Sequence, residues 1–274
     1  MKERLKDAIY GLAVGDALGV PYEFLNRGKF VCEDMIGYGT HNQPKGTWSD
    51  DTSMTLATCM SIKNKGKVDI KDIRKEFEEW LFHSKYTPFG KVFDCGNTCS
   101  KAIYDKKGCD DEWSNGNGSL MRIIPLAFVA NISDEEIENV SAITHAHKIS
   151  KEACVYYVRI AIDLLNGIDL KTSIQNNIPE GSIYDSLLWM EDYVEDEIVS
   201  SGYVVDSFEA AIWCLMKTNT YRDCVIRAVN LGRDTDTIAA IAGGLAGILY
   251  GYDAIPKEWI DSLQQKDMIE ECLF

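Results

Sequence analysis

The sequence has no long apolar run. No segment reaches the roughly 18 consecutive apolar residues that a membrane-spanning helix needs, and the longest candidate, residues 238–250, is short and rich in glycine. The opening segment, MKERLKDAIYGLAVGDALG, is charged and then amphipathic, and it lacks the apolar centre and small-residue cleavage site of an export signal. We therefore expect a protein without a membrane span.

Paired cysteine motifs are also missing. The nine cysteines include no Cys-x-x-Cys pair, and their number is odd. Without an export signal, we interpret them as reduced thiols that mostly pack in the core, and we expect a cytoplasmic protein. The four histidines include His145 and His147, but no cysteine or carboxylate stands at a zinc-like spacing from them. We expect no zinc site.

Basic residues are scarce. The chain has 28 lysines and arginines against 43 aspartates and glutamates, a formal net charge of −15. This charge repels phosphate backbones and anionic lipids, which argues against nucleic acid or a membrane surface as the main partner. A local site for an anionic ligand stays open, because backbone amides and bound metal ions can outweigh net charge. The phosphate loop of nucleoside triphosphatases and the nucleophile elbow of serine esterases are absent as well.

Strand-like alternation is rare, with KFVCEDMIGYG the nearest candidate, and apolar residues recur at helical spacing along almost the whole chain. This spacing predicts helices over many segments, including residues 5–19, 69–84, 181–198 and 236–251. In residues 69–84 it places a set of large apolar residues on one face: Ile70, Ile73, Phe77, Trp80 and Leu81. No proline- or serine-rich linker and no repeat divides the chain. We expect one all-α domain over residues 1–274 and, with no exposed apolar stripe, a monomer.

The loops between these helices are rich in glycine, asparagine and aspartate, and two of them end in acidic clusters at helix starts. The clusters are Ser49, Asp50 and Asp51, and then Asp234, Asp236 and Thr237. Helix capping explains one or two such residues, but each cluster has three. If the two helix starts met, four carboxylates would repel one another unless cations intervened. Their oxygens, with the two hydroxyls, would suit two Mg²⁺ or Mn²⁺ ions. The glycines of AAIAGGLAG would let the second helix pack closely and place its end deep in the molecule.

Motifs spread over nearly the whole chain resemble the ADP-ribosylglycohydrolase family, which includes dinitrogen reductase-activating glycohydrolase and the ADP-ribosylarginine hydrolases. They occur in the family's order: GLAVGDALGVPYEF, GTWSDDTSM, FDCGNTC, NGNGSLMRIIPLA, THAHKISKEA, SGYVVDSFEAAIWC and AVNLGRDTDTIAAIAGGLAGILYG. The resemblance implies an all-α, single-domain orthogonal helical bundle with a binuclear metal centre at the bottom of a cleft. It assigns the metal ligands to Ser49, Asp50, Asp51, Asp234, Asp236 and Thr237.

The resemblance also implies catalytic residues. Asp94 of FDCGN would transfer protons, although Asp-x-Gly is also common in turns and caps. Glu23 of PYEF would lie on a mobile segment over the site, where it guards the metals or moves protons; a surface salt bridge is the alternative. Arg233 replaces a glycine that is usual in the family, and it could contact a substrate phosphate or pair with an acidic neighbour; we expect the acidic partner.

Substrate contacts follow from the same resemblance. The segment NGNGSLMR would turn its backbone amides to a pyrophosphate, with Asn117 and Ser119 adding hydrogen bonds and Gly118 and Met121 lining the site. His145 would approach the substrate at the rim, or else cap a helix or pack in the core. Tyr203 would stack on adenine, or else be a core tyrosine. We expect Arg122 to fix its loop by pairing with an acid.

The resemblance implies a metal-dependent hydrolase that removes ADP-ribose from arginine on a modified protein. Two alternatives stay open. The same chemistry could act on serine-linked, nucleic-acid-linked or free ADP-ribose, although the negative charge disfavours nucleic acid. The chain could also be a non-catalytic binding or immunity relative, although all six expected ligands and Asp94 are present.

Overall fold

The computed structural model describes residues 2–274, and these contain helices, turns and isolated bridges but no β-strand. The α-helices are α1 (Lys2–Gly19), α2 (Asp50–Lys65), α3 (Ile70–His83), α4 (Asn97–Asp105), α5 (Asp134–Ser141), α6 (Lys148–Leu165), α7 (Leu170–Asn177), α8 (Val204–Met216), α9 (Tyr221–Asn230), α10 (Thr235–Tyr250), α11 (Lys257–Ser262) and α12 (Lys266–Cys272). Short 3₁₀ helices join them: η1 (Val20–Tyr22), η2 (Gly39–His41), η3 (Asn117–Arg122), η4 (Ile124–Phe128), η5 (Asp185–Asp192), η6 (Glu195–Glu197) and η7 (Tyr252–Ala254). The expected all-α, single-domain helical bundle is confirmed.

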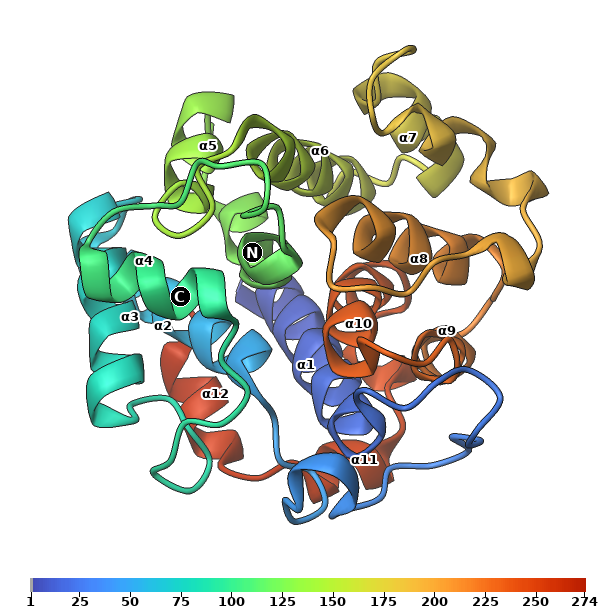
Figure 1. Cartoon of the computed structure of the whole chain (residues 1–274), viewed down its shortest axis with the longest axis horizontal. Coiled ribbons are helices and arrows are strands. Elements are labelled where there is room, and N and C mark those ends of the chain that lie inside the picture. The colour runs from blue at the N-terminus through green and yellow to red at the C-terminus, as the bar shows by residue number, and fades with distance from the viewer. Residues whose placement is uncertain (1) are drawn as a thin grey trace.

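Helices α1 and α10 pack along each other in the middle of the molecule (Figure 1), with a more extensive contact than any other pair of elements. Glycines allow this approach, because a Cβ on Gly15 would lie 2.1 Å from the Ala239 carbonyl oxygen and one on Gly11 would lie 2.3 Å from that of Gly243. At the C-terminal end of α1, a Cβ on Gly19 would lie 2.4 Å from the Asp236 Cα. The close pairing therefore carries the start of α10 to the end of α1, inside the protein.

Helix α2 starts beside this pair. Ser49 caps it by accepting a hydrogen bond from the Asp51 amide, and Gly66 ends it in the left-handed conformation (φ 67°). The start of α2 is tied to α1, because the Ser49 amide donates to Asp16 Oδ1 at 2.9 Å. The start of α10 is tied to the same helix through Thr235 Oγ1, which donates to the Gly19 carbonyl at 2.8 Å. Two helix starts far apart in sequence thus lie at one end of α1.

The remaining helices surround this centre, with α3, α4 and α5 on one side and α8 and α9 on the other (Figure 1). The predicted apolar face of α3 is confirmed for Ile73, Phe77 and Trp80, which are buried, while Ile70 and Leu81 are half-buried. The core also contains the fully buried rings of Trp48, Trp213 and Trp259. All nine cysteines are free and eight of them are buried, as expected for packing thiols.

Two predicted segments differ in the structure. Residues 181–198 form the 3₁₀ helices η5 and η6 instead of an α-helix. Only Leu187 and Met190 of η5 are buried, which leaves no continuous apolar face to hold an α-helix. The nearest strand candidate, residues 29–39, has irregular backbone with one isolated bridge at Tyr38, and its last residue, Gly39, begins η2. No helix among residues 2–274 is long and apolar enough to cross a membrane.

Candidate metal centre and active site

The two acidic clusters meet at the end of α1. Thr237 Oγ1 of α10 lies 3.3 Å from Asp51 Oδ2 of α2, which also accepts from Ser49 Oγ at 2.9 Å. All of Ser49, Asp50, Asp51, Asp236 and Thr237 are buried. Carboxylate and hydroxyl oxygens from the starts of α2 and α10 therefore lie together in one small volume.

Helix capping explains only part of this arrangement. Ser49 caps α2, but Asp234 stands at the N-cap of α10 without a side-chain capping bond and instead accepts from Asn117 Nδ2 at 2.7 Å. Asp51 Oδ1 and Asp236 Oδ2 are buried and have no hydrogen-bond partner among the described residues. Such oxygens are costly in a folded protein unless a proton or cation satisfies them.

Asp16 is a further member of the centre that sequence reasoning missed. This fully buried residue of α1 accepts hydrogen bonds from the Ser49 amide and from both the amide and hydroxyl of Thr52. One carboxylate oxygen each of Asp16, Asp51 and Asp236 lies within 4.8 Å of the other two. The sequence does hold a sign of it, because Asp16 is a lone acid in the apolar run GLAVGDALG.

The electrostatics of the centre favour a cation. Burial, followed by the Asp16 and Asp234 charges, raises the pKa of Asp51 well above its usual value. Burial and then the Glu23 and Asp51 charges do the same to the pKa of Asp236. No lysine or arginine among residues 2–274 forms an ion pair with these aspartates. Hard divalent cations prefer oxygen ligands of this kind, so the residues present fit such an ion.

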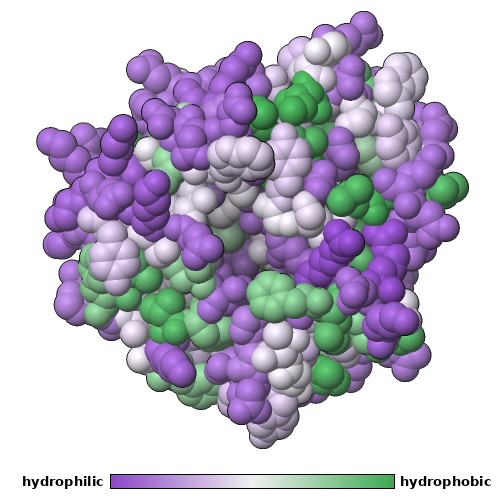
Figure 2. Space-filling model, viewed as in Figure 1, coloured by the Kyte–Doolittle hydropathy of each residue, from purple (hydrophilic) through white to green (hydrophobic). Residues whose placement is uncertain are grey.

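A cavity of about 350 Å³ opens above the centre. Figure 2 shows a hollow near the middle of the face drawn in Figure 1. The cavity wall contains the acids Glu23, Asp50, Asp94 and Asp234, together with Thr237. The rest of the wall comes from residues 95–99 and 116–118 and from Phe24, Met121, His145 and Gly202. The cavity therefore borders both acidic clusters, through Asp50, Asp234 and Thr237. We call the aspartates of the two clusters the acidic floor.

The segment from Asn117 to Arg122 lies beside the cavity but differs from the expected anion loop. The Asn117 amide donates to the Gly202 carbonyl at 3.0 Å, and its side chain donates to Asp234 and Ser207, so this amide does not face the cavity. The Ser119 hydroxyl is fully buried and bonded to Ser141 Oγ at 2.9 Å. Ser119 is therefore a core residue, and its hydroxyl does not face the cavity.

Gly118 and Met121 do line the cavity. A Cβ on Gly118 would lie 2.7 Å from Cys99 Sγ and 2.9 Å from His145 Cε1, so a larger residue would push these side chains. The expected acidic partner of Arg122 is wrong. Its guanidinium is fully buried, donates to the Thr144 hydroxyl at 2.8 Å and stacks over the Phe77 ring. No carboxylate among residues 2–274 forms an ion pair with it.

His145 is both a cavity residue and a buried one. Its ring is 2% exposed and Nδ1 lies 2.9 Å from Thr144 Oγ1. Burial, with a smaller contribution from the Arg122 charge, lowers the pKa of His145 to about 3, so the ring is neutral at physiological pH. Tyr203 is 37% exposed and stands just before α8, outside the cavity wall, so the core alternative does not describe it.

Arg233 also departs from expectation. Its side chain is exposed and forms no ion pair within residues 2–274, so the expected acidic partner is wrong. Its backbone is in the left-handed region (φ 63°), where glycine is favoured. The Arg233 amide and carbonyl bond to the Leu25 carbonyl and the Phe24 amide, which fixes the segment that follows Glu23.

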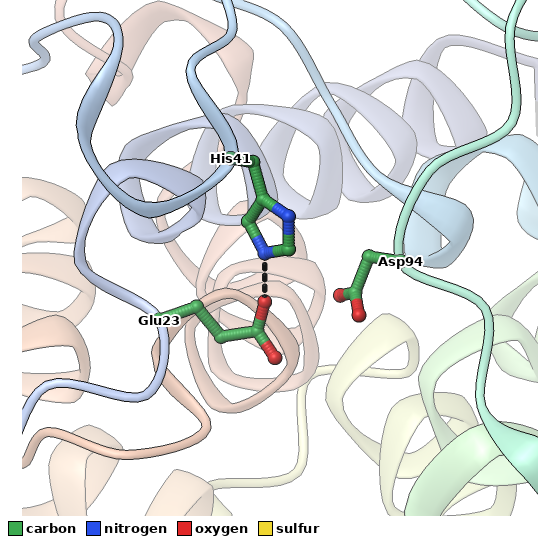
Figure 3. A group of neighbouring side chains, drawn as sticks. All are labelled: Glu23, His41 and Asp94. Atoms are coloured by element: carbon green, nitrogen blue, oxygen red, sulfur yellow. Dashed lines mark hydrogen bonds and ion pairs between the residues drawn. The ribbon is translucent and has the colours of Figure 1, made fainter.

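Glu23 and Asp94 approach each other across the mouth of the centre (Figure 3). Glu23 is 5% exposed, so the surface salt bridge considered for it is wrong, and its carboxylate bonds to His41 Nε2. Burial and the Asp94 and Asp234 charges raise the pKa of Glu23 to about 8, against the effect of His41. Asp94 lies before α4 with a left-handed backbone (φ 51°). Sequence reasoning missed His41, because no spacing or motif connects GYGTHNQP with Glu23.

Comparison with known proteins gives a consistent result. A family model described as ADP-ribosylglycohydrolase matches residues 1–273. The chain is 35% identical to ADP-ribosylarginine hydrolase Tri1 of Serratia proteamaculans (strain 568), over 97% of this chain and 77% of that protein. It is 34% identical to ADP-ribosyl-[dinitrogen reductase] glycohydrolase of Rhodospirillum rubrum, over 96% and 91%. A solved structure titled ADP-ribosylglycohydrolase-related protein complex superposes with a TM-score of 0.83 at 29% identity, covering 99% of this chain and 96% of the other.

Proposed function

Because the chain belongs to the ADP-ribosylglycohydrolase family, we propose that it hydrolyses the N-glycosidic bond between ADP-ribose and an arginine side chain of a modified protein. Two relatives that are 34–35% identical over almost the whole chain support the hydrolase activity. The name of one of them, ADP-ribosylarginine hydrolase Tri1, supports the arginine-type bond. The observation that carries the proposal is that Asp51 and Asp236 meet in the interior, each with one carboxylate oxygen that has no hydrogen-bond partner within residues 2–274.

The proposed ligands of two divalent cations, Mg²⁺ or Mn²⁺, are Ser49, Asp50, Asp51, Asp234, Asp236 and Thr237. Asp16 adds a carboxylate to the same floor. When bound, such cations would supply positive charge that orients the ribose hydroxyls and a water molecule. This assignment is supported by the buried acids, with which no lysine or arginine among the described residues forms an ion pair.

The side chains around the cavity have separate tasks in this proposal. Hydrolysis breaks the bond between the anomeric carbon and the guanidine nitrogen, adds the hydroxyl of water to the carbon and returns a proton to the nitrogen. Asp94, in the cavity wall, accepts the proton of the attacking water. The carboxylates of the floor favour the positive charge that develops on the ribose ring. Glu23 closes the site from the side opposite Asp94 and excludes bulk water from the reacting carbon (Figure 3).

A turnover assay tests the proposal. Purified protein is incubated with ADP-ribosyl-arginine in Mg²⁺, in Mn²⁺ or with a chelator, and release of ADP-ribose is measured. We expect release only with metal, and a loss of at least about a hundredfold in Asp51→Ala and Asp236→Ala, or about 2.7 kcal/mol of transition-state stabilisation.

Asp253→Ala, which changes an exposed aspartate of η7, is the matched control and should keep wild-type turnover. Serine-linked ADP-ribose is assayed in parallel. Turnover that survives both chelation and the two aspartate changes would contradict the metal centre, and faster release from serine would contradict the arginine bond.

A further inference from the structure

His41 connects the two catalytic candidates. It ends η2, and its Nε2 is hydrogen-bonded to Glu23 Oε2. One ligand atom each of Glu23, His41 and Asp94 lies within 4.8 Å of the other two. Figure 3 shows the three side chains converging from three separate segments. The side chain of His41 is only 14% exposed, so its hydrogen bond with Glu23 is largely shielded from solvent.

The backbone fixes His41 relative to Glu23. Thr40 Oγ1 donates to the Glu23 carbonyl at 2.7 Å. Gly39 lies directly on η1, because a Cβ there would be 2.0 Å from the Pro21 carbonyl oxygen. Its φ of 60° is a further reason for glycine at this position. The segment that carries His41 and the segment that carries Glu23 are therefore held together.

Two aromatic rings hold the imidazole from the sides. The centroid of the Phe24 ring lies 5.9 Å from that of His41, and the centroid of Phe93 lies 5.3 Å away. These phenylalanines are the chain neighbours of Glu23 and Asp94. His41 therefore packs against both catalytic segments at once, and its ring has little room to turn.

Charge explains why Glu23 needs such a partner. Its carboxylate faces Asp94 and Asp234, and one of its oxygens lies within 4.8 Å of Asp234 and Asp236 oxygens. In the metal-free protein these acids repel a charged Glu23 carboxylate. His41 is the only basic side chain that pairs with Glu23 within residues 2–274. In the metal-free protein, loss of the His41 partner would therefore let the carboxylate turn away from the acids toward solvent.

We propose that His41 is a positioning residue for the hydrolysis, whose Nε2–H holds the Glu23 carboxylate over the acidic floor and beside Asp94. This role rests on the proposed function. It assigns to His41 no contact with the reacting atoms. Because His41 acts through Glu23, its loss should lower kcat and leave KM and the affinity for metal almost unchanged.

Three substitutions separate the donor from the ring. His41→Phe keeps a ring between Phe24 and Phe93 but removes the donor, His41→Gln places an amide near Nε2, and His41→Asn is too short to reach Glu23. With ADP-ribosyl-arginine and saturating Mn²⁺, we expect kcat to fall at least about tenfold in the Phe and Asn variants and to stay within about threefold in the Gln variant. KM and Mn²⁺ affinity should stay within about twofold. The exposed His83→Phe is the matched control and should behave as wild type.

A double-mutant cycle tests whether His41 acts through Glu23. If it does, the loss of His41 should cost almost nothing once Glu23 is changed. We expect the kcat of the double variant Glu23→Gln/His41→Phe to lie within about twofold of the kcat of Glu23→Gln. Three results would overturn the proposal. They are a wild-type kcat in His41→Phe, a loss of kcat in the double variant that is the product of the two single losses, and an equal loss of kcat in His41→Gln and His41→Asn.

Crystal structures of metal-free wild type and His41→Phe give a readout that needs no turnover. We expect the Glu23 carboxylate to leave the floor in the variant, and an unmoved carboxylate would overturn the role of His41. If wild type hydrolyses no ADP-ribosyl substrate, the proposed function fails. The crystallographic comparison still decides the role of His41, so the two failures are distinct.

Discussion

The buried aspartates are the residues that most need an explanation. Asp16 satisfies its oxygens within the protein, through Ser49 and Thr52. Asp51 and Asp236 do not, since each keeps one buried oxygen that has no partner in the described part of the chain. A protein designed only for stability would avoid such groups. We interpret their cost as the consequence of a site that a cation completes.

The residues that the sequence could reveal are those whose partners are close in sequence. Ser49, Asp50 and Asp51 form one visible cluster, and the capping role of Ser49 follows from its place before a helix. His41 and Asp16 act on residues that meet them only in space, which no local pattern encodes. The same reason explains the wrong partner for Arg122, since an aromatic ring from α3 takes the place of an acid.

His145 predicts a pH dependence of stability. Its pKa is lowered to about 3 by burial, so the folded protein takes up this proton far below the usual value of 6.5, whereas the unfolded chain takes it up near that value. Stability from this group is present above about pH 6.5 and is lost as pH falls toward 3. In His145→Gln, urea unfolding between pH 6.5 and 4.5 should show a free energy that falls less steeply than in wild type, by up to about 1.4 kcal/mol per pH unit. Parallel pH profiles of the two proteins would contradict a neutral buried imidazole.

At the scale of elements, glycine spacing decides where the acids lie. Gly11, Gly15 and Gly19 recur every four residues of α1 and so lie on one side of the helix, against α10. The register of this contact places Asp236 beside Gly19 and near Asp16. The sequence predicted both helices and the close packing of α10, but it could not name α1 as the partner, because many helices offer small residues.

Gly15→Ala tests this register. Helix propensity alone would stabilise the variant by about 1 kcal/mol, but the new Cβ would lie 2.1 Å from the Ala239 carbonyl oxygen, which is backbone and cannot turn away. We expect a net destabilisation of about 1–3 kcal/mol in urea unfolding, together with weaker Mn²⁺ binding because the start of α10 shifts. A variant as stable as wild type or more stable would show that the close approach is unimportant.

At the scale of the molecule, the centre joins parts of the chain that are far apart. Asp16 and Thr237 are separated by most of the sequence. Even so, Thr237 contacts Asp51 of α2, and the Ser49 amide at the start of α2 donates a hydrogen bond to Asp16. The fold class could be predicted because helical periodicity runs through the chain. The spatial convergence could not, except through the family resemblance, since it depends on how α1, α2 and α10 pack. The net charge of −15 makes the centre part of a strongly acidic protein, which favours cations in general.

Anomalous diffraction from crystals grown with Mn²⁺ tests the central claim most directly. We expect two anomalous peaks, both between the start of α2 and the start of α10, with oxygens of Asp51 and Asp236 at coordination distance. These peaks should vanish in Asp51→Ala crystals treated in the same way. A metal centre formed by the starts of α2 and α10 would be contradicted if no peak lay at this site, or if every Mn²⁺ ion were bound only by exposed surface acids.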